Sequence, residues 1–271
     1  MNRVPPRGYH RPVMHPARLR RACAVVTALI ACACQPTFRP QSYQSNEALY
    51  KASLAEFKRG HWDNAVDGFE KLSMDLPARD TLMPRVYWYL GAAHDKRGEH
   101  LLAAQSFTRL AETFPDDSLG DAALLAAGRA YAKMWRKPEL DPTYGETAEN
   151  TLRTMLALYP NSSLRDAAQH EIDHLEEMFA RKSYDIGMHY LRRHAYDSAI
   201  IYLKDVVDKY PSTNAAHDAY LRLVEAYRQI NYKADAVEAC NTARQQYPTD
   251  REVRQLCGPP TSSASASPPA R

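Results

Sequence analysis

The segment His170-Glu171-Ile172-Asp173-His174 has the residue types and spacing of a zinc-protease motif. On a helix, two histidines at i and i+4 share one face and could hold a metal ion, with the glutamate as general base. However, Asp173 places a charge where this motif is usually uncharged, and Ala180 stands where a third histidine would follow. The surrounding sequence also predicts helices without strands. We therefore expect no metal here, and a solvated helix face that carries His170, Glu171, His174 and Glu177.

No other pattern typical of catalysis appears after residue 31. The sequence contains no Gly-rich phosphate loop, no G-x-S-x-G motif and no Cys-x-x-Cys pair there. We therefore expect a protein that is not an enzyme and needs no cofactor. A zinc metalloprotease that acts through the 170–174 motif remains an alternative.

The N-terminal segment, residues 1–31, is typical of a secretory signal. It carries six arginines and no acidic residue, and an apolar run from Ala22 to Ala31 follows the last arginine. This run is too short to span a bilayer, which takes about 20 residues. Either Met1 or Met14 could be the true start.

Cys32 has the context of a lipid-modified cysteine. The sequence Leu29-Ile30-Ala31-Cys32 matches a bacterial lipobox, in which the signal is cut before the cysteine and the cysteine is acylated. Several acyl chains on one residue give stable membrane attachment. Cys34 is the second candidate, and an ordinary secretory signal with an incidental cysteine is the alternative.

Two further segments differ in composition from the body of the chain. Residues 32–45 contain Pro, Gln and Ser without periodicity and predict a flexible tether. Residues 258–271 are almost entirely Gly, Pro, Ser, Thr and Ala and predict a disordered tail. Removal of the six signal arginines changes the formal net charge from +3 to −3. No basic face or nucleic-acid motif remains, so DNA and RNA are not expected partners.

The body of the chain, residues 46–257, repeats one helical pattern five times. Each repeat has Ala, a bulky or apolar residue four positions later, an apolar or small residue three positions after that, and Pro five positions further on. These offsets place three residues on one helix face and then a residue that ends the helix. The pattern predicts an all-α tetratricopeptide-repeat solenoid of about five helical hairpins, a fold that binds other proteins. The five frames are Ala65–Phe69–Leu72–Pro77, Ala103–Phe107–Leu110–Pro115, Ala148–Leu152–Met155–Pro160, Ala199–Leu203–Val206–Pro211 and Ala236–Cys240–Ala243–Pro248.

Two repeats are separated by longer spacings than the others. In the third repeat, two prolines between Arg136 and Thr143 predict an expanded loop. Before the fourth repeat, the sequence predicts an added helix at about residues 163–179. Cys240 and Cys257 could pair in an oxidising compartment, but spacing alone cannot establish the geometry. We favour Cys240 as a buried small apolar residue.

These features together resemble the BamD (YfiO) family of β-barrel assembly lipoproteins. The resemblance covers about residues 32–250. It rests on the lipobox, the five repeats, the loop, the added helix and three stretches of sequence. The stretches are Asn46-Glu47-Ala48-Leu49-Tyr50 with Gly60-His61-Trp62-Asp63-Asn64-Ala65, Leu140-Asp141-Pro142-Thr143 through Tyr159-Pro160-Asn161-Ser162, and Tyr190-Leu191-Arg192-Arg193-His194-Ala195-Tyr196.

The resemblance implies a non-enzymatic lipoprotein of the outer membrane that faces the periplasm. Its C-terminal half would bind the periplasmic domains of the barrel-forming assembly subunit, and its N-terminal half would engage unfolded outer-membrane proteins. Other assembly lipoproteins are further candidate partners. The family places an Arg in helix B of the fourth repeat for the barrel partner. Tyr202 stands at that position here, so this contact must differ, and Lys204 is the candidate cation.

The fifth position of each helix A predicts a surface for a bound peptide. Apolar residues there would suit an extended, aromatic-ended segment, and Arg85 could meet its carboxylate one turn before Trp88. The alternative is that Tyr50 and Trp88 pack between hairpins, since both residue types serve either use. The five positions are Tyr50, Trp88, Leu125, Tyr184 and Leu221.

A second function is compatible with the same fold. Periplasmic adaptors of the Tol-Pal-associated type carry similar repeats, but typically with an N-terminal coiled coil and a soluble signal. The tether here is too short for a coiled coil, which favours barrel assembly.

Overall fold

The computed structural model describes residues 38–258. The described residues fall into two units, residues 38–43 and residues 44–258. The described part of the first unit contains the 3-10 helix η1 (Pro40–Ser42). The predicted signal, Cys32, Cys34 and the predicted tail beyond residue 258 lie outside the described residues.

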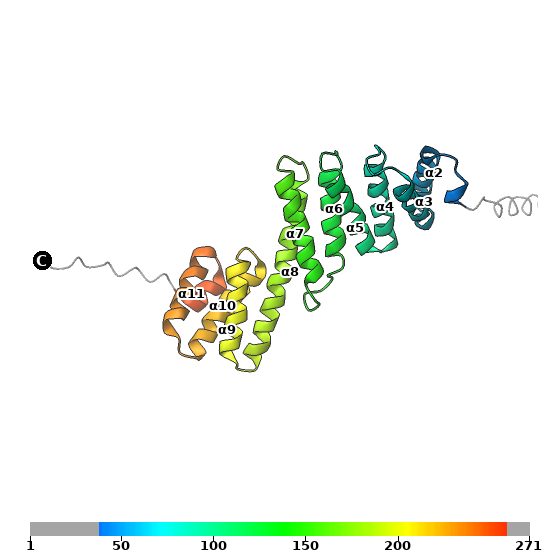
Figure 1. The fold of residues 1–271 in the computed structure, drawn as a ribbon. Helices are drawn as coiled ribbons and strands as arrows, with labels where there is room; N and C mark the ends of the chain where they lie inside the picture. Colours follow the sequence, from blue (N-terminus) through cyan, green and yellow to red (C-terminus); the bar gives the residue numbers. More distant parts are fainter. Residues whose placement is uncertain (1–37, 259–271) are drawn as a thin grey trace, which may run out of the picture. The chain divides into compact units, whose positions relative to one another are not determined.

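Over its described residues, 44–258, the second unit contains helices and no strands, which confirms the predicted fold class (Figure 1). Consecutive helices pack as antiparallel pairs: α2/α3, α4/α5, α6/α7, α8/α9 and α10/α11, followed by α12. Within residues 38–258, no helix combines the length and the apolar character needed to cross a bilayer. The helices are α2 (Asn46–Arg59), α3 (Trp62–Asp75), α4 (Met83–Arg97), α5 (His100–Thr113), α6 (Gly120–Ala132), α7 (Thr143–Leu158), α8 (Arg165–Arg192), α9 (Tyr196–Lys209), α10 (Asn214–Gln229), α11 (Lys233–Gln246) and α12 (Arg251–Cys257).

The repeated residues form the core of each hairpin, as the pattern predicts. All fifteen residues that precede the prolines in the five frames are buried. Glycines on helix A receive the large residues of helix B. A Cβ at Gly91 would lie 2.9 Å from the Phe107 ring, and a Cβ at Gly128 would lie 2.6 Å from Leu152 Cγ. Such distances are shorter than van der Waals contact, so only glycine permits this helix spacing.

The first turn of the array is fixed by one buried carboxylate. Glu56, near the end of α2, accepts hydrogen bonds from Arg59 (2.8 Å) and Asn64 (2.7 Å) and lies 2.8 Å from His61 Nδ1. Burial alone would raise the pKa of Glu56, but the hydrogen bonds from Asn64, His61 and Arg59 together lower it. The turn itself passes through Gly60, whose φ of 81° favours glycine.

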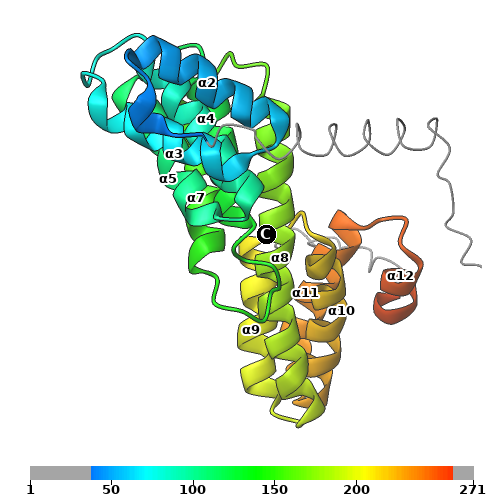
Figure 2. The ribbon, with the colours of Figure 1, turned by 90° about the vertical axis from the view of Figure 1, so that its right-hand side faces the viewer.

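The added helix before the fourth repeat is present, but it is not a separate element. It continues without interruption into the first helix of that repeat, which gives the 28-residue helix α8. Residues 180–183 are Ala-Arg-Lys-Ser, and they contain neither Gly nor Pro to end the helix. Figures 1 and 2 show α8 running from the side of α7 to the side of α9 and α10.

The predicted loop of the third repeat is confirmed, and it is fastened to the middle of α8. Lys182 Nζ donates hydrogen bonds to the carbonyls of Pro138 (3.1 Å) and Leu140 (2.9 Å). Trp135, at the start of the loop, is buried with its ring centroid 4.5 Å from that of Phe179. These contacts join the loop to α8 at two points.

The C-terminal end corrects one expectation. Cys240 is not a free buried thiol, because it forms a disulfide with Cys257 across α11 and α12. The sequence could not establish this pairing, since it depends on a turn at residues 247–250 that brings α12 back onto α10 and α11. Val253 of α12 is fully buried, and Arg228 of α10 donates a hydrogen bond to the Leu256 carbonyl (2.9 Å). The short helix α12 therefore covers the end of the last hairpin.

Candidate functional site

A groove of about 350 Å³ lies between the first helices of the second and third hairpins. The central part of its lining is apolar. Trp88 of α4 packs against Phe107 with ring centroids 5.3 Å apart, and Leu125 of α6 lies across from α4. Alanines on both helices leave the space open, since larger side chains at these positions would fill it. The apolar lining consists of Trp88, Ala92, Phe107, Ala122, Leu125, Ala126 and Leu164.

The end of the groove near the α4–α5 turn carries charged groups. Lys133 Nζ lies 2.6 and 2.7 Å from the two Asp95 oxygens, and Arg129 Nε donates to Glu171 at 2.8 Å. His100 Nδ1 lies 2.9 Å from Asp95. Burial alone would raise the pKa of Asp95, but Lys133 and His100 outweigh it and lower the pKa. Asp95 is therefore ionised at neutral pH and holds Lys133 in place.

The groove has the dimensions of a short extended peptide. The stretch of α6 from Ala122 to its C-cap Lys133 is about 16 Å long at about 1.5 Å per residue. An extended chain of about five residues covers the same distance. An apolar trough with ion pairs at one end suits a segment that carries apolar side chains, as ligand sites generally combine apolar walls with a few polar groups.

Of the three residues predicted to hold the end of a bound peptide, Tyr50, Arg85 and Trp88, only Trp88 lines this groove. Tyr50 packs instead between the first two hairpins, where its ring centroid lies 6.0 Å from Phe69 and 6.5 Å from Tyr89. Burial raises the pKa of Tyr50, and the positive charge of Arg85 acts in the opposite direction, which places Arg85 near Tyr50. The Arg85 side chain is exposed, one helical turn before Trp88.

The other fifth positions of helix A are less accessible than predicted. Leu125 lines the groove although it is mostly buried, but Tyr184 and Leu221 are buried in the core of the C-terminal hairpins. Among these fifth positions, only Trp88 of α4 and Leu125 of α6 therefore line the groove. The repeat pattern cannot reveal this, because it predicts equivalent positions and not which of them a neighbouring hairpin covers.

The residues predicted to contact the partner subunit lie on α9. Tyr202 is half-buried and stacks on Tyr190 of α8, with ring centroids 5.5 Å apart and an interplanar angle of 10°. Lys204 is exposed. Tyr190 also lines a hollow of about 410 Å³ beside Lys182 and the 133–142 loop. Both predicted residues thus lie on the C-terminal half of the array.

The two histidines of the zinc-protease motif lie on an outer face of α8, whereas Ile172 between them is buried. His170 and His174 are exposed, whereas Glu171, the candidate base, accepts a hydrogen bond from Arg129. Among residues 38–258, no group of three or more His, Cys, Asp or Glu side chains is arranged to hold a metal ion. The predicted Glu177 has a structural role, because its carboxylate accepts the backbone N–H groups of Asn214 and Ala215 at the start of α10.

Comparison with known proteins decides the family. The sequence model of YfiO, described as an outer membrane lipoprotein, matches residues 42–243. The chain belongs to the YfiO family. Among curated YfiO relatives, the outer membrane protein assembly factor BamD of Caulobacter vibrioides is 26% identical over 238 residues, which cover 87% of this chain and 78% of the relative. The BamD of Vibrio cholerae is 25% identical over 227 residues, 79% of this chain and 91% of the relative.

The solved structures that resemble this chain include tetratricopeptide-repeat proteins. One from Bacteroides fragilis has a TM-score of 0.48 and 13% sequence identity, and the match covers 79% of this chain and 97% of that protein.

Sequence reasoning missed Arg129, Lys133 and the alanines of the groove. Ala122 and Ala126 are spaced i, i+4 on α6, so small residues at this spacing on a helix A were an available signal. The charges carried no such signal, because the Lys133–Asp95 pair joins residues of different hairpins that the sequence separates by 38 positions.

Proposed function

We propose that this YfiO-family lipoprotein acts in the assembly of outer-membrane proteins and binds extended segments of its unfolded clients in the α4–α6 groove. The groove carries the proposal, since it is an open apolar trough of the right length on the N-terminal half of the array. The aromatic C-terminal residue of a client would lie against Trp88, and Arg85 would receive its carboxylate. The residues upstream would run along α6 toward Lys133.

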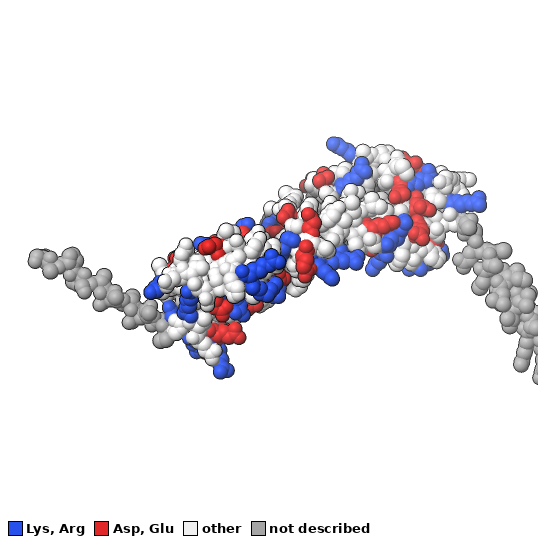
Figure 3. Space-filling view, turned by 90° about the horizontal axis from the view of Figure 1, so that it is seen from below, with Lys and Arg blue, Asp and Glu red and all other residues white. Residues whose placement is uncertain are grey.

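The C-terminal half would bind the periplasmic domains of the barrel-forming subunit. Tyr202 and Lys204 on α9 are the candidate contacts, and the stacking of Tyr202 on Tyr190 would hold the tyrosine in place. The membrane would be reached through acylated Cys32 and a tether over residues 32–45. On the face shown in Figure 3, acidic and basic side chains are interspersed rather than segregated. Shape and apolar contact, not net charge, would then select the partners.

A binding assay with a short peptide tests the groove. The probe is a labelled five-residue peptide that ends in Phe with a free carboxylate. We expect Trp88→Ala and the groove-filling variant Ala126→Leu to weaken the binding of this peptide at least tenfold. Arg85→Gln should weaken the binding of the free peptide more than that of the same peptide with an amidated C-terminus. Ile201→Ala removes an exposed apolar residue on α9 and serves as the matched control.

Tyr50→Ala separates the two roles considered for that residue. Because Tyr50 packs on Phe69 and Tyr89, we expect lower stability but nearly unchanged peptide affinity. Full affinity in a folded Tyr50→Ala/Trp88→Ala double variant would rule out the groove as the client site.

Co-purification from cross-linked membranes tests the partner. Tagged chain should recover a large barrel protein with repeated periplasmic domains, and Tyr202→Ala/Lys204→Ala should reduce the yield. Recovery of Tol-Pal proteins without a barrel subunit would favour the adaptor function instead.

A further inference from the structure

The second hairpin departs from the other four at the two positions before its signature alanine. Hairpins one, three, four and five have Asp63-Asn64, Glu146-Thr147, Asp197-Ser198 and Ala234-Asp235 there. Each pair contains an acid in the first turn of a helix, where the helix dipole favours negative charge. Hairpin two has Leu101 and Leu102 instead, and these side chains are 37% and 44% exposed. The substitution exposes apolar surface and forgoes a favourable charge, so folding does not account for it.

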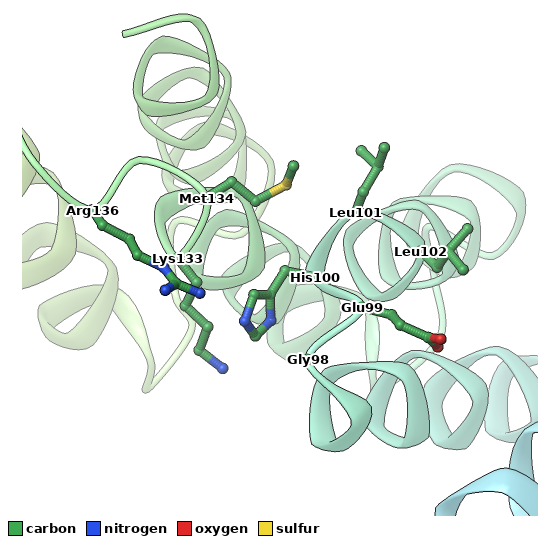
Figure 4. A pocket seen from close by; sticks show the side chains of 8 residues that line it. All are labelled: Gly98, Glu99, His100, Leu101, Leu102, Lys133, Met134 and Arg136. Atoms are coloured by element: carbon green, nitrogen blue, oxygen red, sulfur yellow. The ribbon is translucent and has the colours of Figure 1, made fainter. Parts of the chain in front are cut away.

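The two leucines adjoin a hollow of about 460 Å³ at the turn edge of the array. Figure 4 shows Leu101 of α5 and Met134 of the α6–α7 loop on opposite sides of this hollow. The side chains of His100, Lys133 and Arg136 gather along another side of it. Single exposed apolar residues are ordinary on protein surfaces, whereas here an exposed apolar pair and a third apolar residue gather around one hollow.

This turn-edge hollow continues the α4–α6 groove. The groove runs along α4 and α6 and reaches their C-terminal ends at Asp95 and Lys133, and the hollow begins at the same ends, with Gly98 and Lys133 in its wall. Lys133 lines both spaces, and its ion pair with Asp95 holds it between them.

We infer that the turn-edge hollow is a second subsite for the same extended client segment, which leaves the groove beside Lys133. This inference rests on the proposed function of the groove. With the aromatic end of the client at Trp88, about five residues occupy the groove, and the residues upstream of them reach the hollow. An apolar side chain of the client packs there against Leu101, Leu102 and Met134. The ligand is thus a segment of about eight to ten residues with apolar side chains on one face, as in a β-strand whose side chains alternate between two faces.

Two peptides and one double variant test the second subsite. The five-residue peptide described above fills the groove alone, and a ten-residue peptide extends it upstream with alternating apolar and polar residues. The variant Leu101→Asp/Leu102→Asn installs the pair that hairpin one carries at the same positions, so it preserves the helix start. Ile201→Asp on α9 is the control for charge at an exposed apolar position. Circular dichroism and the melting temperature confirm that both variants are folded.

The wild-type protein should bind the ten-residue peptide about tenfold more tightly than the five-residue one, which corresponds to burial of on the order of 60 Å² of apolar surface. The double variant should lose this gain and keep its affinity for the short peptide. A gain in affinity that persists in the variant would overturn the inference. So would a variant that binds both peptides like the wild-type protein but no longer co-purifies with the barrel-forming subunit. If the short peptide does not bind the wild-type protein, the groove is not the client site, and the second subsite is rejected together with it.

Discussion

At the scale of single residues, the Glu56 carboxylate shows how a buried charge stabilises a turn. Three donors compensate for its burial, and their combined effect lowers its pKa. A carboxyl group whose folded-state pKa is depressed contributes stability above its unfolded-state pKa, and this contribution is lost as the pH falls through the folded-state pKa.

We therefore expect Glu56→Gln to lower the free energy of unfolding at pH 7 by about 1–3 kcal/mol, because it weakens charge-assisted hydrogen bonds to a buried side chain. The loss should diminish as the pH falls below the ordinary range of a glutamate, where the wild-type side chain is protonated as well. Urea unfolding at several pH values measures this effect. Glu47→Gln is the control, since the Glu47–Lys51 pair is exposed and its loss should change stability far less than the loss of the Glu56 carboxylate. Equal losses in both variants would contradict the role of burial.

Gly128 offers a second test at the residue scale. Its missing Cβ makes room for Leu152, so Gly128→Ala should destabilise the fold by about 1–3 kcal/mol despite the higher helix propensity of alanine. Leu152→Ala should cost about 2–5 kcal/mol through the cavity that it leaves. The double variant should cost less than the sum of the two, because the new methyl group enters that cavity. Additive losses in thermal unfolding would show that the two residues do not share one space.

Residue-level prediction succeeded where the repeat itself dictates the environment. The frame residues are buried because every hairpin uses them in the same way. Prediction was weaker for Tyr50, Tyr184 and Leu221, whose exposure depends on the neighbouring hairpin. The Lys133–Asp95 and Arg129–Glu171 pairs were not predicted, since each pair joins separate elements of the array.

At the scale of elements, α12 is joined to α11 by a covalent bond, the Cys240–Cys257 disulfide. The seven-residue helix is too short to be stable alone, and the disulfide closes a loop with a sequence separation of 17. By the chain-entropy relation, such a bond contributes about 3 kcal/mol.

Replacing both cysteines with serine, Cys240→Ser/Cys257→Ser, should therefore release α12. We expect fast amide exchange at residues 251–257, with protection of α2–α7 unchanged, because stability in a repeat array is local. Hydrogen exchange read by mass spectrometry measures this, and oxidised and reduced wild-type protein provide the matched pair. Unchanged exchange in α12 would show that noncovalent contacts, such as those of Val253, Arg228 and Arg244, are enough to hold it.

The hairpins and the loop could be predicted from the sequence, but the fusion of the added helix with the first helix of the fourth repeat could not. The repeat pattern places the start of a helix A near residue 180 and a separate helix before it, whereas the residues between them are good helix formers and the helix simply continues. The pairing of α12 was equally inaccessible, because seven residues after a proline turn carry too little periodicity to predict where they pack.

At the scale of the whole repeat unit, the two proposed binding sites are separated along one array. The proposed client groove lies on α4 and α6, and the candidate subunit contacts lie on α9. Helix α8 connects the two regions, with Glu171 and Glu176 paired to α6 and α7, and Glu177 bound to the start of α10.

The uninterrupted course of α8 has a mechanical consequence. A helix of 28 residues is about 42 Å long, and its continuous backbone hydrogen bonds make it a rigid connection between the hairpins at its two ends. The hairpins on either side of it should therefore tumble in solution with a single rotational correlation time. A Gly-Pro pair inserted between Lys182 and Ser183 should divide that motion into two faster ones, as nuclear spin relaxation would record. In this variant, a rotation of the N-terminal hairpins caused by a bound client would no longer rotate the C-terminal hairpins.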